Sequence, residues 1–412
     1  MVLTAQGPHV YMVAMVALTI ALGALGFGVP PAMAAGPDFK QWLGGLRSEA
    51  LAKGVSEGTL DRALARARLM DRVIELDRQQ PEFTRTFWSY LNKRVTPERI
   101  RRGREELARN MPLLILVSRH FGVQPRFLVA LWALESSFGD DTGGFDAISA
   151  LATLAFDTRR GEFFRNELLT LLKTMDQGDI RIDANSSWAG AMGQPQFMPT
   201  TYQEYAVDFD GNGRRDLWDS LADVFGSAAN YLKSAGWRAN QTWGREVLLP
   251  PDFDYALAEL DIRKPVSEWA RLGVRDARGR PLPNPAVEAS IILPGGVYGA
   301  PAFMVYPNFR AIMVWNPSIL YAIAVGHLAD RLAGEGPFVT PPPAREVPLS
   351  MAQVKEIQSL LASNGFDAGK PDGIVGPQTR QAVRAYQKAA RLPADGFPTV
   401  ALLENLRLTA RN

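Results

Sequence analysis

The sequence predicts a mainly α-helical protein with a minor β element, followed by a small C-terminal module of three helices. Three observations carry this prediction. Apolar residues recur at three- and four-residue spacing through most of the chain, which is typical of amphipathic helices. β-like runs occur only near residues 287–306, and a proline-rich stretch at 333–348 separates residues 349–409 from the rest. With 412 residues, 47% of them hydrophobic, the chain can form more than one domain with a sizeable core.

The charge of the chain is nearly balanced, because its formal net charge is only +2. No nucleic-acid partner is therefore expected. The basic run at Lys93, Arg94, Arg99, Arg101, Arg102 and Arg104 is interleaved with Glu98, Glu105 and Glu106, which favours a solvated helix face. The absence of cysteine excludes disulfides, thiolate metal sites and a lipid-modified cysteine.

The N-terminal segment predicts export from the cytoplasm. An apolar run precedes Asp38, the first acidic or strongly basic side chain, and ends in the small-residue pattern Ala32-Met33-Ala34. This pattern predicts a secretory signal peptide over 1–34 and a periplasmic protein. An uncleaved membrane anchor is the alternative, because the apolar run approaches the length that spans a bilayer.

The body from 35 to 332 contains several segments with helical spacing. They cover residues 38–54, 56–69, 97–122, 222–236 and 318–334. A further helix is predicted from Pro125 to Gly139, since proline suits a first helical turn and glycine a helix end. Every residue from 127 to 134 is apolar, so this helix should be buried. Glu135 stands at the end of that run, and a structural role, paired with an arginine or reaching solvent, is its first interpretation.

A proline- and glycine-rich linker over 333–348 cannot form a regular element. In the following module, Ser350 and Gln353 form a capping box for a helix. A turn-rich stretch leads to a second helix that begins at Pro377, and the third helix covers residues 399–406. A compact binding module is the expectation for a unit of this size.

The run DFDGNGRRDLWD, residues 208–219, fits a twelve-residue calcium loop of the EF-hand type. The glycine of the sharp turn is Gly213. The expected ligands are Asp208, Asp210, Asn212, the carbonyl of Arg214, Asp216 and Asp219. Only one such loop is present, so a structural Ca²⁺ is favoured over a calcium sensor.

Residues 185–211 combine glycines with uncharged polar and aromatic side chains. Gly190 and Gly193 allow close backbone approach, while Ser187, Gln194 and Gln196 offer neutral hydrogen-bonding groups. The aromatic members are Trp188, Phe197, Tyr202 and Tyr205. Apolar planes beside neutral polar groups suit sugar rings, although such clusters also occur in protein cores.

The motif GAMGQPQFMPTTY, followed directly by the calcium-type loop and with ALESSFG upstream, resembles the B-type lytic murein transglycosylases, and the order of segments matches over about residues 38–332. The segments GFDAGKPDGIVGPQTRQAVRAYQ and LPADG resemble the peptidoglycan-binding three-helix module. The resemblance implies a lysozyme-like catalytic fold over 35–332 and a wall-binding module over 349–409. It implies peptidoglycan glycan strands as the partner and leaves protein partners in wall synthesis or division unidentified.

The resemblance also implies site residues. Glu135 would be the single catalytic acid and base in cleavage between N-acetylmuramic acid and N-acetylglucosamine, leaving a 1,6-anhydromuramic end. Ser187 and Gln196 would be polar partners, and Tyr90, Tyr231 and Asn316 would be further cleft residues. The family often has tyrosine directly before that asparagine, where this chain has Trp315.

Glu135 must be protonated to act as an acid, and two features predict a raised pKa. Apolar burial disfavours the carboxylate, and the negative end of a helix dipole disfavours it further. The alternatives are a lysozyme-type hydrolase that adds Asp140 or Asp141 as a second carboxylate, and a non-catalytic wall-binding protein. Both aspartates are expected to be solvated or to cap a turn.

Overall fold

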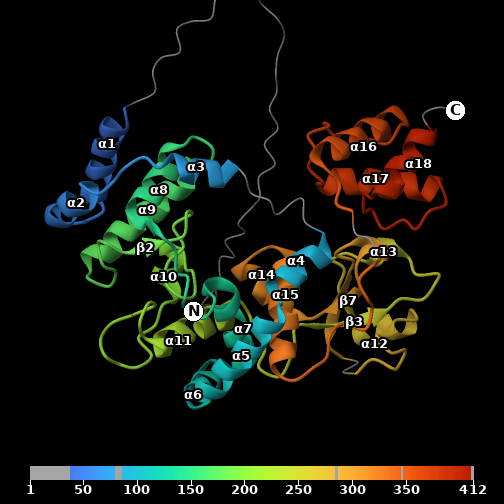
Figure 1. Ribbon diagram of the computed structural model, residues 1–412, viewed down its shortest axis with the longest axis horizontal. Helices are drawn as coiled ribbons and strands as arrows, with labels where there is room; N and C mark the ends of the chain where they lie inside the picture. Colours follow the sequence, from blue (N-terminus) through green and yellow to red (C-terminus); the bar gives the residue numbers. More distant parts are fainter. Residues whose placement is uncertain (1–37, 79–85, 284–285, 345–346, 410–412) are drawn as a thin grey trace, which may run out of the picture.

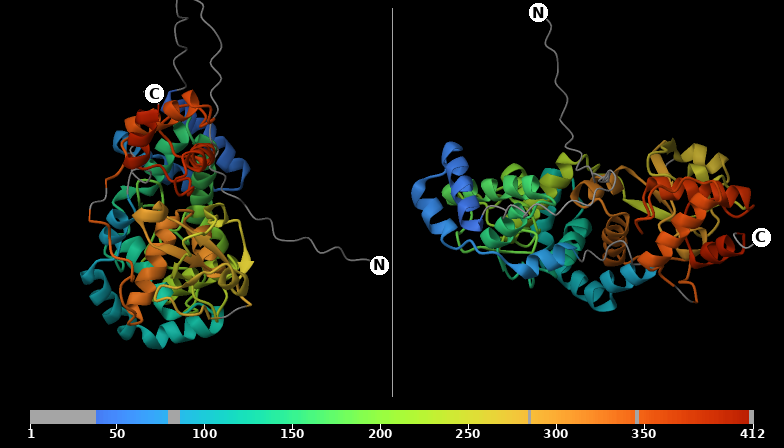
Figure 2. Two further views of the ribbon diagram at one scale, coloured as in Figure 1. Left: turned by 90° about the vertical axis from the view of Figure 1, so that its right-hand side faces the viewer. Right: turned by 90° about the horizontal axis from the view of Figure 1, so that it is seen from above.

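The computed structural model describes residues 38–78, 86–283, 286–344 and 347–409. The predicted signal peptide lies outside these residues. The described chain is elongated, with helices α1 (Phe39–Ala52) and α2 (Glu57–Leu64) at one end and a β-sheet together with the C-terminal module at the other (Figures 1 and 2). Among the described residues no single helix is both long and apolar enough to cross a membrane. Only the pair α14 (Pro307–Trp315) and α15 (Ile319–Leu332), bent by 116°, reaches that length and apolarity together.

The N-terminal helical part has its own core. It is formed by α1 (Phe39–Ala52), α2 (Glu57–Leu64), α3 (Asp71–Arg78), α8 (Ala147–Phe156), α9 (Gly161–Asp176) and α10 (Pro199–Tyr205). A two-stranded ribbon of β1 (Phe145–Asp146) and β2 (Asn185–Ser186) lies beside it. Helix α8 is the most buried of these helices, because every residue from 147 to 155 is apolar or a small polar residue.

A second core surrounds helix α7 (Pro125–Ser136). Its other helices are α4 (Phe87–Arg94), α5 (Pro97–Arg109), α6 (Met111–Phe121), α11 (Leu221–Ser234), α14 (Pro307–Trp315) and α15 (Ile319–Leu332). Helix α7 packs against α5, α6, α11 and α15. All residues from 127 to 134 are buried, as their composition predicts, so α7 holds Glu135 on a fully enclosed support.

The β element is larger than predicted. A five-stranded antiparallel sheet has the order β4-β6-β7-β3-β5. Its strands are β3 (Gly244–Leu248), β4 (Lys264–Pro265), β5 (Arg275–Asp276), β6 (Glu288–Ile292) and β7 (Ala302–Val305), with α12 (Val266–Arg271) and α13 (Gly296–Gly299) beside them. The sequence indicated β6 and β7 but not β3. Strand β3 contains Arg245 and Glu246, whose charges conceal its pairing with β7.

The predicted linker contains no helix or strand in its described part, but it is attached to the body. The ring of Phe338 lies against His327, with 3.9 Å between ring centroids, and against Phe303 at 5.0 Å. The Glu246 carboxylate accepts hydrogen bonds from the backbone N–H groups of Val339 (2.6 Å) and Thr340 (2.7 Å). Residues 338–340 are therefore a packed strap and not a free tether.

The C-terminal module consists of α16 (Met351–Ser363), α17 (Pro377–Ala389) and α18 (Val400–Thr409) around a small core of its own. The predicted capping box of Ser350 and Gln353 is present. The module lies next to the sheet (Figure 1), where Asp395 accepts a hydrogen bond from Val297 N–H at 2.9 Å. Arg384 forms an ion pair with Glu259 at the same contact.

Candidate active site

Glu135 occupies the last turn of α7, directly before an abrupt change in backbone direction. Ser137, Phe138 and Gly139 all have positive φ, of 52°, 65° and 85°. The left-handed conformation costs a non-glycine residue on the order of 1 kcal/mol or more and is retained only where packing enforces it. The Phe138 ring packs edge-on against Trp132, 5.4 Å between centroids, and lies 4.7 Å from the guanidinium carbon of Arg102. This packing fixes the turn that follows Glu135.

Two side chains donate hydrogen bonds to one oxygen of Glu135. The indole Nε1 of Trp315 donates to Oε1 at 2.9 Å, and the Tyr321 hydroxyl donates to the same atom. Trp315 ends α14 and Tyr321 lies in the first turn of α15, so the bend between these helices places both donors over the end of α7. The family often has tyrosine at this position, and the indole N–H of Trp315 supplies a hydrogen-bond donor in place of the tyrosine hydroxyl.

Burial raises the pKa of Glu135 above its ordinary value, and this influence outweighs the others. The hydrogen bonds from Tyr321 and Trp315 and the positive charge of Arg94 lower that pKa and offset part of the rise. Some of the Glu135 side chain stays accessible to solvent, which leaves room for a substrate oxygen to reach it. The site therefore favours a neutral carboxylic acid and also stabilises the carboxylate that proton donation would create.

An aromatic wall extends from Trp315. Its ring centroid lies 5.2 Å from those of Tyr231 and Phe197, and Tyr231 stacks on Tyr205 at 4.5 Å. Tyr231 also donates a hydrogen bond to the Val314 carbonyl at 3.2 Å. The structure thus brings the predicted residue Tyr231 into contact with a partner of Glu135, and the stacked rings offer planar apolar faces of the kind that bind sugars.

The other predicted polar residues lie in segments near this wall but make local hydrogen bonds. Gln196, with φ of 53°, donates to the carbonyls of Thr142 (3.2 Å) and Gly193 (2.9 Å). The Ser187 hydroxyl accepts from Ala191 N–H at 3.1 Å. Asn316 accepts from Ser318 N–H at 3.0 Å. The described part of the chain contains no hydrogen bond from these three side chains to Glu135.

Tyr90 is buried in α4, and the guanidinium carbon of Arg94 lies 5.7 Å from its ring centroid. The predicted residue Tyr90 is near the donor Tyr321, since the ionised form of one would raise the pKa of the other. Sequence reasoning missed Arg94 and Tyr321 as neighbours of Glu135. The signal for Tyr321 was weak, because it is a single hydroxyl in an apolar helix.

The loop after α7 is held by a side chain that the sequence singled out only for its polarity. Gln194 accepts a hydrogen bond from Trp132 Nε1 at 2.6 Å and donates to the Trp218 carbonyl. A Cβ atom at Gly139 would lie 2.6 Å from the same Gln194 oxygen, and φ is positive there, so glycine is required. Gln194 therefore connects α7 with the acidic loop at 208–219.

The two aspartates of the hydrolase alternative are engaged elsewhere. Asp140 is exposed, and its ion pair with Arg102 holds its pKa below the usual range. Asp141 accepts a hydrogen bond from Gly143 N–H at 3.2 Å. Within the described residues neither aspartate is hydrogen-bonded to Glu135. Glu135 therefore does not hold either of them in place as a second catalytic carboxylate.

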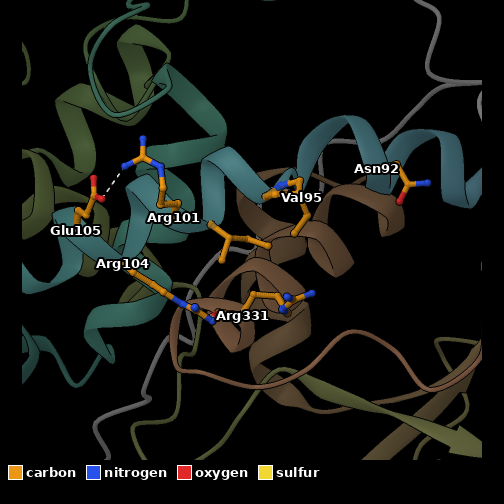
Figure 3. Close-up of a pocket in the computed structure, with 8 residues that line it drawn as sticks. Asn92, Val95, Arg101, Arg104, Glu105 and Arg331 are labelled. Atoms are coloured by element: carbon orange, nitrogen blue, oxygen red, sulfur yellow. Dashed lines mark hydrogen bonds and ion pairs between the residues drawn. The ribbon is translucent and has the colours of Figure 1, made fainter.

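A separate surface hollow of about 610 Å³ lies between the α4–α5 corner and the end of α15 (Figure 3). Arg101 and Glu105 form an ion pair on its rim at 2.6 Å, and Arg104 donates to the main-chain oxygen of Arg331 at 2.7 Å. None of its lining residues contacts Glu135 by a hydrogen bond. The hollow is therefore distinct from the site around Glu135.

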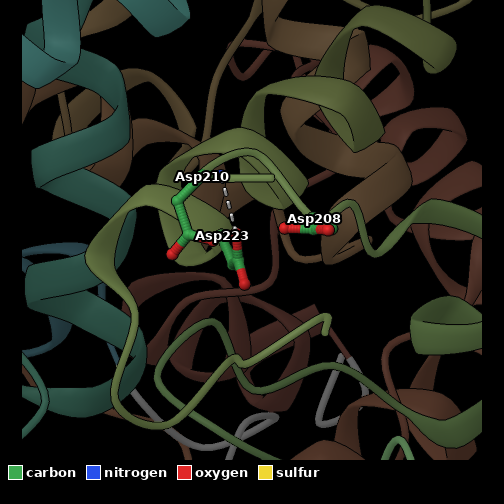
Figure 4. Close-up of side chains that lie close together, drawn as sticks. All are labelled: Asp208, Asp210 and Asp223. Atoms are coloured by element: carbon green, nitrogen blue, oxygen red, sulfur yellow. Dashed lines mark hydrogen bonds between the residues drawn. The ribbon is translucent and has the colours of Figure 1, made fainter. Parts of the chain in front are cut away.

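The predicted metal loop gathers a different set of acids from the one expected. Asp208, Asp210 and Asp223 place ligand oxygens within 4.8 Å of one another, and Figure 4 shows the three side chains converging. Asp223 lies beyond the twelve-residue template, in the first turn of α11. Asp216 and Asp219 are outside this group in the described chain, and Asp216 accepts hydrogen bonds from the N–H groups of Trp218 and Asp219.

Backbone donors shape this loop. Asp208 accepts from the N–H groups of Gly211 (2.8 Å) and Gly213 (2.7 Å), and Asn212 accepts from Arg214 N–H at 2.9 Å. Asp223 is fully buried, and burial is the largest of the influences that raise its pKa. Three carboxylates with hard oxygen donors so close together fit Ca²⁺, whose positive charge offsets their mutual repulsion.

The family model described as a transglycosylase SLT domain matches residues 38–330, and the one described as a putative peptidoglycan-binding domain matches 350–406. Membrane-bound lytic murein transglycosylase B of Escherichia coli (strain K12) is 32% identical over 296 residues, which are 68% of this chain and 79% of that protein.

Solved structures of two proteins are similar to this chain. SltB3 from Pseudomonas aeruginosa, in complex with NAG-anhNAM-pentapeptide, is 48% identical, with a TM-score of 0.87 over 90% of this chain and all of that one. A further structure of the same protein contains NAG-NAM-pentapeptide. Escherichia coli Slt35 in complex with calcium is 31% identical, with a TM-score of 0.61, and covers 71% of this chain and 92% of that one.

Proposed function

Because the chain belongs to the lytic transglycosylase family with an SLT domain, we propose that it cleaves peptidoglycan between N-acetylmuramic acid and N-acetylglucosamine and leaves a 1,6-anhydromuramic end. The observation that carries this proposal is the environment of Glu135, a lone carboxylic acid in an apolar setting with both of its donors on one oxygen. The complex of SltB3 with NAG-anhNAM-pentapeptide supports the anhydro product.

The first step is proton donation by Glu135. In a neutral carboxylic acid one oxygen accepts hydrogen bonds and the other carries the proton. Trp315 and Tyr321 both donate to Oε1, so Oε2 carries the proton and faces the glycosidic oxygen. The bond between C1 of the muramic residue and that oxygen breaks as the proton moves to the leaving sugar.

The second step returns the proton. The Glu135 carboxylate removes it from the muramic 6-hydroxyl, and the freed oxygen bonds to C1 of the same sugar. The reaction consumes no water, because the proton from the 6-hydroxyl replaces the one that Glu135 gave to the leaving sugar. Glu135 is thereby restored to its acid form. The two donors on Oε1 and the nearby charge of Arg94 stabilise the carboxylate between the steps. A single carboxyl group is sufficient because the substrate supplies its own nucleophile, whereas hydrolysis uses a second carboxylate.

The remaining features support a cell-wall enzyme. We assign catalysis to residues 35–332 and wall binding to the module at 349–409, joined through the linker at 333–348. Tyr90, Ser187, Gln196, Tyr231 and Asn316 are proposed to contact the glycan strand. The chain is proposed to be exported to the periplasm, where this substrate occurs.

We also propose that the acidic loop holds a structural Ca²⁺. Asp208, Asp210 and Asp223 would be its carboxylate ligands, and the calcium complex of Slt35 supports the assignment. A bound cation would fix the start of α11, and the same helix carries Tyr231 into the aromatic wall. Calcium would thus stabilise the wall without taking part in proton transfer.

Mass spectrometry of digested peptidoglycan tests the reaction. The expected muropeptides end in anhydromuramic acid and are one water lighter than hydrolysed fragments. Products with reducing ends alone would instead identify a hydrolase.

Truncation after residue 344 tests the module, because it keeps the packed strap at 338–340. The truncated protein should sediment less with insoluble wall than the full chain and should cleave short muropeptides at an unchanged rate. Equal sedimentation of both proteins would refute the binding role.

A further inference from the structure

Two arginines at the corner between α4 and α5 have no carboxylate partner among the described residues. Arg94 ends α4, and the half-buried Arg99 in α5 donates a hydrogen bond to the main-chain oxygen of Arg94. Two other members of the same basic run are neutralised, whereas Lys93 and Arg104 also lack a carboxylate partner among the described residues. Arg101 pairs with Glu98 and Glu105, both at 2.6 Å, and Arg102 pairs with Asp140. Arg94 and Arg99 are therefore two uncompensated cations that lie together at the corner between α4 and α5.

Arg94 lies near the reacting group, because its helix α4 packs against α15, which carries the Glu135 donor Tyr321. Its guanidinium carbon is 5.7 Å from the Tyr90 ring centroid, and its charge lowers the pKa of both Glu135 and Tyr321. Arg94 also acts on Arg99, whose pKa falls through burial and through the nearby like charge. Two close cations repel each other, and an anion placed between or beside them relieves that repulsion.

The proposed substrate carries such an anion at a defined place. Muramic acid differs from N-acetylglucosamine by a lactyl ether on O3, which ends in a carboxylate or in a peptide with carboxylates of its own. The two SltB3 complexes contain muramic acid in its peptide-bearing form. The planar guanidinium group matches the geometry of a carboxylate and can bind it through two N–H groups.

We propose that Arg94, with Arg99 adding to the positive potential, binds a carboxylate carried by the muramic residue and thereby selects that sugar over N-acetylglucosamine for the position beside Glu135. This proposal rests on the proposed function, since it specifies what the same cleft recognises. It assigns Arg94 and Arg99 to substrate binding, where the sequence indicated only a solvated helix face.

The test combines Arg94→Met with chemical removal of the substrate charge. Glycan strands with their peptides and strands freed of peptides by an amidase are each used untreated and after conversion of carboxylates to amides with carbodiimide and ammonia. Lys93→Met is the matched control, because it removes one positive charge from the preceding residue, which is exposed. Arg94→Lys shows whether a point charge restores binding, and melting curves establish that each variant is folded.

On untreated strands Arg94→Met should lower kcat/KM by roughly 10- to 100-fold, mainly through KM, as expected for loss of a hydrogen-bonded ion pair. A smaller loss in kcat should accompany it, because the Glu135 carboxylate loses a nearby positive charge. Amidation should lower the wild-type value by a similar factor and leave the Arg94→Met value unchanged. Lys93→Met should stay close to wild type. A loss on untreated strands that carry peptides indicates that a peptide carboxylate is bound. A loss on untreated strands freed of peptides indicates that the lactyl carboxylate is bound.

An equal loss in Arg94→Met on amidated and untreated strands would overturn the proposal. That outcome, with a shifted pH–rate profile, would show that Arg94 acts only on the charge of Glu135. A wild-type enzyme indifferent to amidation would overturn it independently of how well any variant folds. Failure of the wild-type protein to form anhydro ends would instead count against the proposed function, because that measurement does not involve Arg94.

Discussion

The active site and the acidic loop use the same functional group for opposite purposes. Glu135 lies in the last turn of a buried helix, its donors meet on one oxygen, and burial raises its pKa. Asp208 lies on a loop, and both of its oxygens accept backbone N–H groups while two other carboxylates lie close by. The first arrangement suits proton transfer and the second suits a divalent cation. The difference shows that the surroundings of a carboxyl group, more than its identity, determine its chemistry.

The strongest way to break this comparison is Glu135→Gln. The amide oxygen of glutamine can still accept from Trp315 and Tyr321, so the fold should persist while proton transfer is lost. We expect formation of anhydro ends to fall by about 10²- to 10⁴-fold or more, the range for loss of a general acid or base. Muropeptide analysis measures this loss, and binding to intact wall should be retained. Cleavage near the wild-type rate would remove Glu135 from the mechanism.

The same variant has a second readout in stability. The pKa of Glu135 is higher in the folded chain than in the unfolded chain, so the folded state holds the extra proton over the pH window between the two values. Wild-type stability therefore falls as pH rises through that window, and Glu135→Gln has no such loss. Melting curves at about pH 4 and about pH 7 measure this. The melting temperature of the variant relative to that of the wild type should be higher at about pH 7 than at about pH 4.

Asp140→Asn is the matched control for both readouts. Asp140 is exposed and paired with Arg102, so its replacement should change the rate by no more than about twofold, as is usual for surface sites. A loss comparable to that of Glu135→Gln would restore the two-carboxylate hydrolase as the better description.

A finer test changes the surroundings of Glu135 and not the group itself. Tyr321→Phe removes one of the two donors on Oε1, which favour the carboxylate. The pKa of Glu135 should rise further, so the alkaline limb of the pH profile for kcat/KM should move to higher pH. The maximum kcat should fall roughly tenfold, because the carboxylate formed in the first step loses a charge-assisted hydrogen bond.

Tyr306→Phe is the control for Tyr321→Phe. Tyr306 is also buried, but its hydroxyl accepts a hydrogen bond from Arg245 at 2.8 Å, in the sheet. Its loss should lower stability without moving the alkaline limb. A limb that stays fixed in Tyr321→Phe, or moves to lower pH, would contradict the role assigned to the two donors.

The sequence was informative where the determinants are local. Proline at the first turn and an unbroken apolar run predicted α7 and its burial, and the position of Glu135 followed from them. The partners of Glu135 were beyond reach, because Tyr321 is 186 residues away and is brought back by the bend between α14 and α15. Strand β3 was missed for the same reason, since only its pairing with β7 identifies it.

The acidic loop shows where a local template fails. A twelve-residue pattern placed the last ligand at Asp219, whereas the structure gathers Asp223 from the first turn of the next helix. Position along the chain could not reveal this, because α11 begins at Leu221 and turns Asp223 back toward the N–H groups of Phe209 and Asp210. The predicted sharp turn at Gly213 is present, with φ of 89°, and its N–H donates to Asp208.

The smallest expected effect, and the one that sharpens the comparison most, separates Asp223 from Asp219. Calcium at about one hundred times its Kd should stabilise the wild-type chain by about 2.7 kcal/mol, by mass action on the folded state. Asp223→Asn removes the buried charge from the group of three carboxylates and should abolish this calcium-dependent rise in Tm, whereas Asp219→Asn should retain it. Calorimetry with calcium and with a chelator measures both variants. Loss of the shift in Asp219→Asn alone would favour the twelve-residue ligand set, and a wild-type curve that calcium does not move would refute the site.

Activity should change little in either variant, because the loop acts on the cleft only by holding α11 and the aromatic ring of Tyr231 at its far end.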